Sequence, residues 1–220
     1  MMRKIIISIA VLIFLLAMKA YAYDDHDFQV WNTDIEEFNI GKDLKLITEQ
    51  EFRWADNARE FNYQHYDIGL FYGLNKNWSV GGGYRQVYEL SGGKFKEENE
   101  PYVTATLTLT GGGFTFESRN RIEYRHFAYN KADSGRYRNK FTLKLPFKFT
   151  KIQIQPFIGD EVMFSIGGTN QFSQNRFSAG LGTTLTKNVK AEIYYMLVSV
   201  KSAGRWVDSN VLGTKLKLVF

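Results

Sequence analysis

Gly113 to Phe127, with the sequence GFTFESRNRIEYRHF, interleaves two kinds of side chain at a period of two. The odd-numbered positions carry mostly charged groups, and the even-numbered positions carry mostly apolar or aromatic ones. Successive side chains of a strand point to opposite faces, so this stretch predicts a strand with one charged and one apolar face. A soluble sheet would turn the charged face to water, whereas a membrane barrel would turn it into the lumen and the apolar face to lipid.

The overall composition fits one sheet domain without a recognisable cofactor. The 220 residues include 16% aromatic residues, 19 Gly, 3 Pro and no Cys. The mean hydropathy is -0.30 and the one long apolar run is N-terminal, so a membrane protein built of helices of ~20 apolar residues is excluded. Without Cys, neither a disulfide framework nor a thiolate metal site is available, and no motif predicts a cofactor.

The N-terminus has the pattern of a secretory signal peptide. Arg3 and Lys4 precede an apolar run at residues 5–18, and Ala20-Tyr21-Ala22 supplies the small residues that a signal peptidase reads. We therefore expect residues 1–22 to be cleaved, leaving a single barrel domain at residues 23–220. A membrane anchor is the alternative, which the short run disfavours. Cleavage would remove three basic residues from a formal charge of +5, so nucleic-acid binding is not expected.

Strand-like segments follow one another along the rest of the chain, each about ten to thirteen residues long, which exceeds the usual length in soluble sheets. Alternation is clear at residues 44–54, 78–89, 102–110, 136–147, 175–186, 189–200 and 209–220. Small residues on the charged faces, among them Gly81, Gly83, Gly180 and Gly182, are expected to leave room for long Arg and Lys side chains. These features predict an all-β, antiparallel transmembrane barrel.

The connections are predicted to alternate in length, as they do in outer-membrane barrels. Short turns are expected at residues 41–43, 75–77, 111–113, 148–151 and 187–188. Longer polar loops are expected at residues 56–60, 91–100, 128–135, 167–174 and 201–208. A soluble, lipocalin-like barrel with reversed faces is the alternative, and strand length together with this asymmetry disfavours it.

The strand count has two alternatives. Eleven segments are strand-like, but single-chain bacterial barrels usually have an even number of strands. Residues 28–38 would either cross the lumen, leaving about ten wall strands, or be joined by a strand that the pattern does not reveal, giving twelve. We expect ten. Because Pro156 lacks an N–H group for the ladder, we also expect a bulge within residues 152–164.

Several short motifs are spread along nearly the whole chain. They are VW at 30–31, EQEFR at 49–53, YDIGL at 66–70 with LNK at 74–76, GYR at 83–85, RNRIEYR at 119–125, RNK at 138–140 and EIYYM at 192–196. On these motifs, residues 24–220 resemble an uncharacterised bacterial outer-membrane β-barrel family catalogued only as a domain of unknown function. The terminal Phe220 matches the signature that such barrels present to their assembly machinery. The resemblance implies a fold and an outer-membrane location, and no catalytic residues.

Charged side chains on the inward face are the candidate functional residues. Those chosen as lumen-lining are Arg85, Glu117, Arg119, Arg121, Glu123, Arg125, Arg138, Lys140 and Lys144. One interpretation is a structural barrel filled by a salt-bridge network, because buried charges persist when they are paired. It is favoured because a barrel of ~10 strands is nearly filled by its side chains. The other is a narrow pore whose cationic ladder attracts small anionic solutes.

Two further classes compete with the structural barrel and the pore. An outer-membrane enzyme acting on lipid or peptide would use His65 as a base and Asp67, two residues away on the same face, as its orienting carboxylate. A structural hydrogen bond is the favoured interpretation, since no nucleophile motif accompanies the pair, and no catalytic or metal-binding residue is assigned. A partner-binding barrel would contact lipopolysaccharide or other outer-membrane lipids through charged stretches at residues 91–100 and 136–138.

Overall fold

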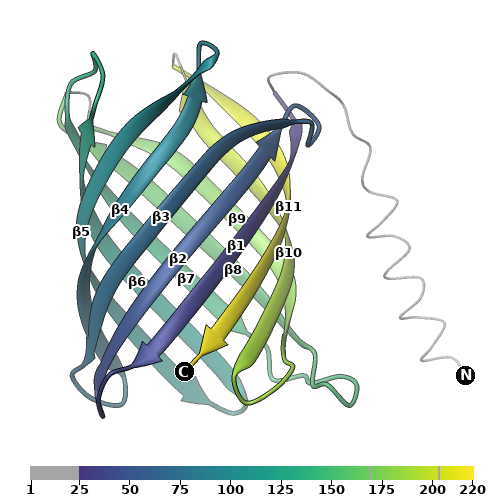
Figure 1. The fold of residues 1–220 in the computed structure, drawn as a ribbon. Coiled ribbons are helices and arrows are strands. Elements are labelled where there is room, and N and C mark those ends of the chain that lie inside the picture. Colours follow the sequence, from purple (N-terminus) through teal and green to yellow (C-terminus); the bar gives the residue numbers. More distant parts are fainter. Residues whose placement is uncertain (1–24, 169, 203) are drawn as a thin grey trace, which may run out of the picture.

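The computed structural model describes residues 25–220 apart from residues 169 and 203, so the expected signal peptide lies outside the described residues. Eleven strands in this part of the chain form one closed barrel (Figure 1). They are β1 (Asp27–Asn39), β2 (Leu44–Ala55), β3 (Glu60–Gly73), β4 (Trp78–Ser91), β5 (Lys94–Gly111), β6 (Phe114–Phe127), β7 (Ser134–Lys144), β8 (Gln155–Ile166), β9 (Gln171–Thr184), β10 (Val189–Ser202) and β11 (Arg205–Val219). The prediction of an all-β, mostly antiparallel barrel is confirmed.

The barrel closes through one parallel pair of strands, β1 and β11, while all other neighbours are antiparallel. Eleven strands that alternate in direction leave the first and the last pointing the same way, and closure sets Trp31 opposite Gly213. The expectation of ten wall strands, with residues 28–38 across the lumen, is therefore wrong. In the wall β1 hydrogen-bonds along both edges, to β2 and to β11, whereas a strand across the lumen would lose these partners.

The expected alternation of short turns and long loops is not found. Strands β4 and β5 meet at Gly92-Gly93, whose φ angles of 63° and 75° belong to a tight hairpin turn. Residues 91–100, predicted as a loop, are therefore mostly wall strand. The longest connection spans residues 145–154 and includes the short turn predicted at residues 148–151. It lies at the end of the barrel that holds the C-terminus (Figure 1).

An irregularity is found within residues 152–164, as expected, but it does not lie at Pro156. Pro156 is the second residue of β8, and the neighbouring strand β7 has already ended, with Lys144 paired to Phe157 as the last rung. The missing N–H group of Pro156 therefore removes no hydrogen bond between β8 and β7. The irregularity in this strand lies farther along, between Met163 and Phe164.

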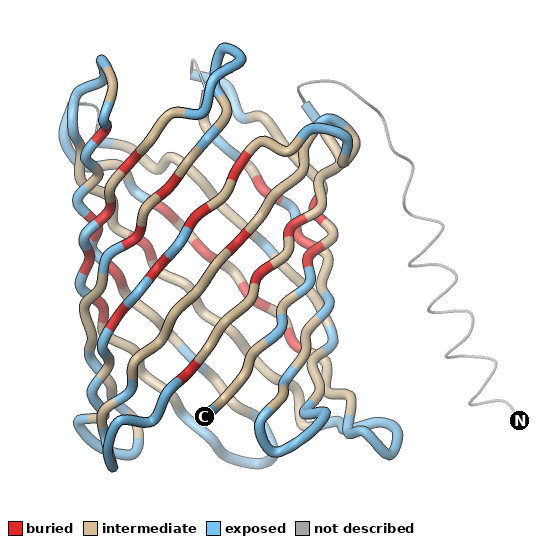
Figure 2. Tube along the Cα trace, viewed as in Figure 1, coloured by how far each residue is buried: buried red, intermediate tan, exposed pale blue. Residues whose placement is uncertain are grey.

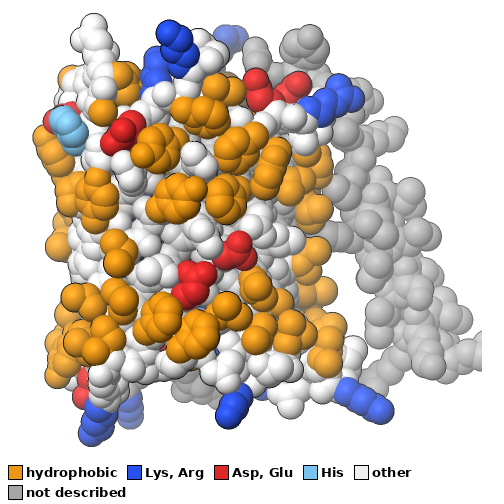
Figure 3. Space-filling view, in the orientation of Figure 1, with side chains coloured by type: hydrophobic (Ala, Val, Ile, Leu, Met, Phe, Trp, Pro, Cys, Tyr) orange, Lys and Arg blue, Asp and Glu red, His pale blue; other side chains and the backbone are white. Residues whose placement is uncertain are grey.

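The wall reverses the distribution of side chains found in soluble proteins. Glu123 and Arg121 on the inner face are 1% and 4% exposed, whereas Ile122 between them is 57% exposed. Buried and exposed positions alternate along the strands (Figure 2). Hydrophobic side chains gather in two bands on the outer wall, above and below a mid-height zone that includes acidic groups (Figure 3). The interior is thus polar and the outer wall largely apolar.

Glycines on the inner wall accommodate aromatic rings. A Cβ at Gly213 would stand 2.1 Å from Tyr194 Cζ, and a Cβ at Gly83 would stand 2.5 Å from the Tyr102 hydroxyl. We expected such glycines to make room for Arg and Lys side chains. These contacts show that Gly83 instead makes room for a tyrosine ring. Beside the β1–β11 seam, Tyr194 packs against a small buried cluster of Trp31, Met196, Val198 and Val211.

Candidate functional site

The structure places all nine lumen-lining candidates on the inner face of the wall. Seven of them line the cavity described below, namely Arg85, Glu117, Arg119, Arg121, Arg138, Lys140 and Lys144. The other two, Glu123 and Arg125, belong to an ion-pair network in the half of the barrel toward the β4–β5 turn. Further buried acids that were not selected as lumen-lining share the interior, among them Glu98, Glu100 and Glu161. Glu98 and Glu100 could have been found from their parity with Tyr102 and Thr104 on the same strand.

A network of charged side chains lies on the inner faces of β5, β6 and β7, in the half of the barrel toward the β4–β5 turn. Arg125 pairs with Glu98 and, at 3.4 Å, with Glu100. Arg136 pairs with Glu100 and, through Nε at 2.5 Å, with Glu123. We call these five residues the closing network. Each acid in it is at most 6% exposed, so the charges are stabilised by one another rather than by water.

Arg136 of the closing network and the nearby Arg138 correct the expectation that residues 136–138 meet lipid phosphates. Arg136 points inward, and Arg138 reaches Glu123 at 2.9 Å and Glu161 at 2.8 Å. The buried side chains of Phe127 and Met163 lie on the same half of their strands as the network. Charged and apolar groups together therefore fill this half of the barrel.

Arg53 on β2 stacks against aromatic rings of the two neighbouring strands, β1 and β3. Its guanidinium carbon lies 3.6 Å from the ring centroid of Trp31 and 3.7 Å from that of Tyr63. Its Nη2 is 2.6 Å from Glu51, which also accepts a hydrogen bond from Thr33 at 3.0 Å. Stacking of a cation between aromatic faces is worth ~2 kcal/mol where water is excluded, so Arg53 is held rigidly.

His65 and Asp67 share the inner face but do not contact each other as a base and its orienting carboxylate. His65 Nε2 lies 3.0 Å from Glu49, and its Nδ1 lies 3.1 Å from the hydroxyl of Tyr63. Asp67 instead accepts hydrogen bonds from Arg85 at 3.0 Å and from Tyr102 at 2.7 Å. Within the described part of the chain, no Ser or Thr hydroxyl is hydrogen-bonded to His65. The two side chains therefore belong to a buried hydrogen-bond network in which each has its own partners.

A cavity of about 740 Å³ occupies the rest of the lumen. Its mouth is lined by residues of the β1–β2 and β3–β4 turns, including Lys42, Asn75 and Lys76. None of its lining residues comes from the described turns at the other end of the barrel. The cavity therefore reaches the end of the barrel that holds the C-terminus, and its lining stops short of the described turns at the β4–β5 end. The two ends can be followed in Figure 1.

Lysines outnumber acids around the outer part of this cavity. Each of two acids is shared by two lysines: Glu37 pairs with Lys45 at 2.7 Å and Lys217 at 2.6 Å, and Glu192 pairs with Lys215 at 3.3 Å and Lys144 at 3.8 Å. Lys190, which also lines the cavity, has no ion pair within 4.0 Å among the described residues. The mouth of the cavity therefore carries a surplus of positive charge.

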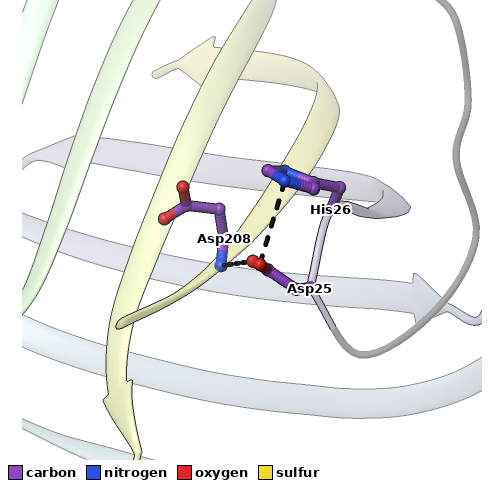
Figure 4. Close-up of side chains that lie close together, drawn as sticks. All are labelled: Asp25, His26 and Asp208. Carbon is purple, nitrogen blue, oxygen red and sulfur yellow. Dashed lines mark hydrogen bonds and ion pairs between the residues drawn. The ribbon is translucent and has the colours of Figure 1, made fainter. Parts of the chain in front are cut away.

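A possible metal-ligand cluster lies at the rim, outside the cavity. The ligand atoms of Asp25, His26 and Asp208 lie within 4.8 Å of one another (Figure 4). The backbone N–H of Asp208 donates to Asp25 Oδ1 at 2.9 Å, and the His26 ring lies 3.8 Å from Asp25. These contacts account for the arrangement, and Asp25 and His26 are exposed, so we assign the cluster no metal role.

The fold and the interior define a class: a closed eleven-stranded barrel with an ion-paired lumen and an apolar outer wall. Residues 28–209 match a family described as a protein of unknown function (DUF2490), and the chain belongs to this family. The resemblance to a domain of unknown function is thus confirmed. No curated protein matches the chain. In the described ranges, no helix has the length and apolar character needed to cross a membrane.

Proposed function

We propose that the chain is a barrel of the bacterial outer membrane whose lumen is closed to through-passage. The observation that carries the proposal is the reversal of burial, with charged side chains inside and large apolar ones outside. Val103 and Ile68, for example, are 61% and 51% exposed on the outer wall. A soluble protein rarely exposes so continuous an apolar surface, and lipid is the solvent that suits it.

Polar groups on the outer wall hydrogen-bond to neighbouring strands, which lowers their cost in lipid. Asn32 donates to Thr214 at 3.1 Å and Thr48 donates to Glu36 at 2.5 Å beside the β1–β11 seam. Away from the seam, Asn139 on β7 donates a hydrogen bond to Asn120 on β6 at 2.9 Å. Asp34 is an outward acid near the seam whose side chain makes no hydrogen bond or ion pair with the described residues, and it provides a direct test of the outer environment.

The C-terminal residue fits an encounter with the assembly machinery. Phe220 is 61% exposed and stacks on Phe38 of β1, with ring centroids 5.0 Å apart. An exposed aromatic terminus on the last strand is available to a partner before the seam closes. Outer-membrane lipids, lipopolysaccharide among them, would contact the wall and the rim, and a small anionic solute would contact the lumen.

Closure of the lumen is the second part of the proposal, and a narrow anion pore is its competitor. Closure is favoured by the closing network and by Arg53, whose ion pairs and stacked rings occupy space inside the barrel. In keeping with this, the lining of the cavity includes no residue from the described turns at the β4–β5 end. The surplus of lysines around the mouth favours anions if a path opens. An enzyme acting through His65 is less well supported, because no Ser or Thr hydroxyl of the described residues is hydrogen-bonded to that side chain.

Planar-bilayer recording of the refolded chain tests both parts. We expect insertion without steady current, and steady current after the double substitution Glu100→Ala and Arg136→Ala, which removes the centre of the closing network. Lys201→Ala, at a position that does not line the cavity, is the matched control and should stay silent. A steady anion-selective current from the unmodified chain would establish the pore instead, and failure to insert would contradict the membrane location.

A further inference from the structure

Two like-charged pairs stand side by side on the inner face of β6 and β7. In the register of these strands Arg119 lies directly opposite Lys140, and Arg121 lies directly opposite Arg138. We call these four residues the basic quartet, and all four line the cavity. Like charges directly opposite each other destabilise a sheet, so two such pairs in succession need compensation from nearby negative charge.

The protein supplies too little of that charge. One carboxylate, Glu161, faces three guanidinium groups, those of Arg138 at 2.8 Å, Arg119 at 3.1 Å and Arg176 at 3.5 Å. Lys140 has no hydrogen bond and no ion pair within 4.0 Å among the described residues, although it neighbours Glu161 in the register with β8. The quartet is thus served by three buried acids, Glu161, Glu123 and Asp67, and two of these are already engaged by other arginines. Arg136 engages Glu123, and Arg85 engages Asp67.

Arg121 shows where the compensation is missing. Its side chain is 5% exposed, and its guanidinium stacks on Tyr102 at 3.8 Å. Its Nε and Nη1 atoms are buried without a hydrogen-bond acceptor, and the nearest carboxylates lie 3.6 Å and 3.8 Å away. Buried donors left without acceptors are costly, and a guanidinium offers a fork that matches the oxygens of a phosphate or carboxylate. Both observations point to an acceptor-rich anion.

We propose that the inner end of the cavity binds a small soluble solute carrying a phosphate group, held by the basic quartet. A phosphate dianion offers two negative charges and several acceptor oxygens, so it can serve Arg121 and Lys140 together. The volume of about 740 Å³ admits the rest of a small organic molecule. Lysines at the mouth, among them Lys45 and Lys190, raise the local concentration of anions.

This inference deepens the proposed function, since it names the solute class of the closed lumen. It needs only that the cavity be open at its lysine-lined mouth. A barrel that conducts would therefore overturn the proposed closure and leave the anion site standing. A silent barrel that binds no phosphate would overturn the anion site alone.

Titration calorimetry of the refolded chain in neutral detergent micelles tests the site with glycerol 3-phosphate, with glycerol as the uncharged control. We expect binding of glycerol 3-phosphate that weakens with added salt, and none of glycerol. Arg121→Gln and Lys140→Gln should each weaken it about ten- to hundredfold, the range expected for a lost charge-assisted hydrogen bond. Lys201→Gln, away from the cavity, should bind as the unmodified chain does.

Circular dichroism of each variant shows that the barrel is formed, and phosphorus NMR line broadening of glycerol 3-phosphate on the unmodified chain gives a measurement that needs no variant. Absence of both heat and broadening would overturn the proposal. If both quartet variants bind glycerol 3-phosphate as tightly as the unmodified chain does, the proposal is also overturned, because the phosphate would then lie elsewhere. Binding of short-chain phosphatidic acid without binding of glycerol 3-phosphate would assign the site to a lipid headgroup and overturn the soluble solute.

Discussion

The ring of Tyr194 on β10 lies over Gly213 on β11, its register partner, and fills the space in which any other residue would place its Cβ. Gly213 is also opposite Trp31 across the parallel seam. The pair therefore couples the packing of the last two strands to the contact that closes the barrel.

Gly213→Ala should destabilise the barrel by about 1–3 kcal/mol, because a new methyl group forces the Tyr194 ring out of a packed cluster. The free energy of unfolding in detergent micelles, from guanidinium titration, measures the effect. Gly41→Ala is the control, since a Cβ at Gly41 meets nothing within 4 Å. Equal stability of the two variants would show that the ring moves aside freely.

Glu161→Gln should cost about 3–5 kcal/mol, the range seen when one partner of a buried ion pair is removed. The substitution keeps the shape of the side chain but leaves Arg119, Arg138 and Arg176 facing a neutral group. Glu117→Gln makes the same chemical change at an exposed inner position without a recorded ion pair, and should shift the unfolding free energy by less than ~0.5 kcal/mol. Similar losses in both variants would argue against a special role for Glu161.

Asp34→Leu should stabilise the barrel in a lipid bilayer by about 1–2 kcal/mol, because an outward carboxylate in lipid is unfavourable. Thr33→Leu, one residue away on the opposite face, should destabilise it, since Thr33 is buried and donates to Glu51. Unfolding free energies in bilayers of neutral lipid measure both. A stabilising Thr33→Leu together with a destabilising Asp34→Leu would reverse the assignment of the two faces.

Asp133, in the connection between β6 and β7, should titrate well below an ordinary aspartate. Hydrogen bonds from His126 at 2.9 Å, Tyr124 at 2.6 Å and the backbone N–H of Phe127 at 3.1 Å lower the pKa of its carboxyl group to about 2. A lowered pKa means that these bonds contribute stability above the unfolded value near 3.8, and that this contribution is lost as the pH falls toward 2.

Carbon NMR titration of the Asp133 carboxyl group measures this pKa directly. Tyr124→Phe removes one of the three donors and should move the midpoint toward the ordinary value. Tyr66→Phe makes the same change on another strand and should leave the midpoint where it is. A midpoint near 3.8 in the unmodified chain would contradict the bonding seen at this turn.

The sequence by itself determined which side chains share a face. A period of two is a local property, so the charges of β6 and β7 could be assigned to one side of the wall before any contact was known. The all-β barrel and the family resemblance followed from the same alternation and from short motifs. The choice of ten strands failed because an expected even count outweighed the clear pattern at residues 28–38.

Only the tertiary structure decided which charges meet. Register and closure join residues far apart in the chain, such as Arg138 with Glu161, and no local pattern records those pairings. The loop assigned at residues 91–100 hid Glu98 and Glu100, and with them their ion pairs to Arg125 and Arg136. His65 and Asp67, adjacent by parity, found different partners because Glu49 and Tyr102 arrive from other strands. Alternation fixes the face of a side chain, while its partner depends on how the sheet closes.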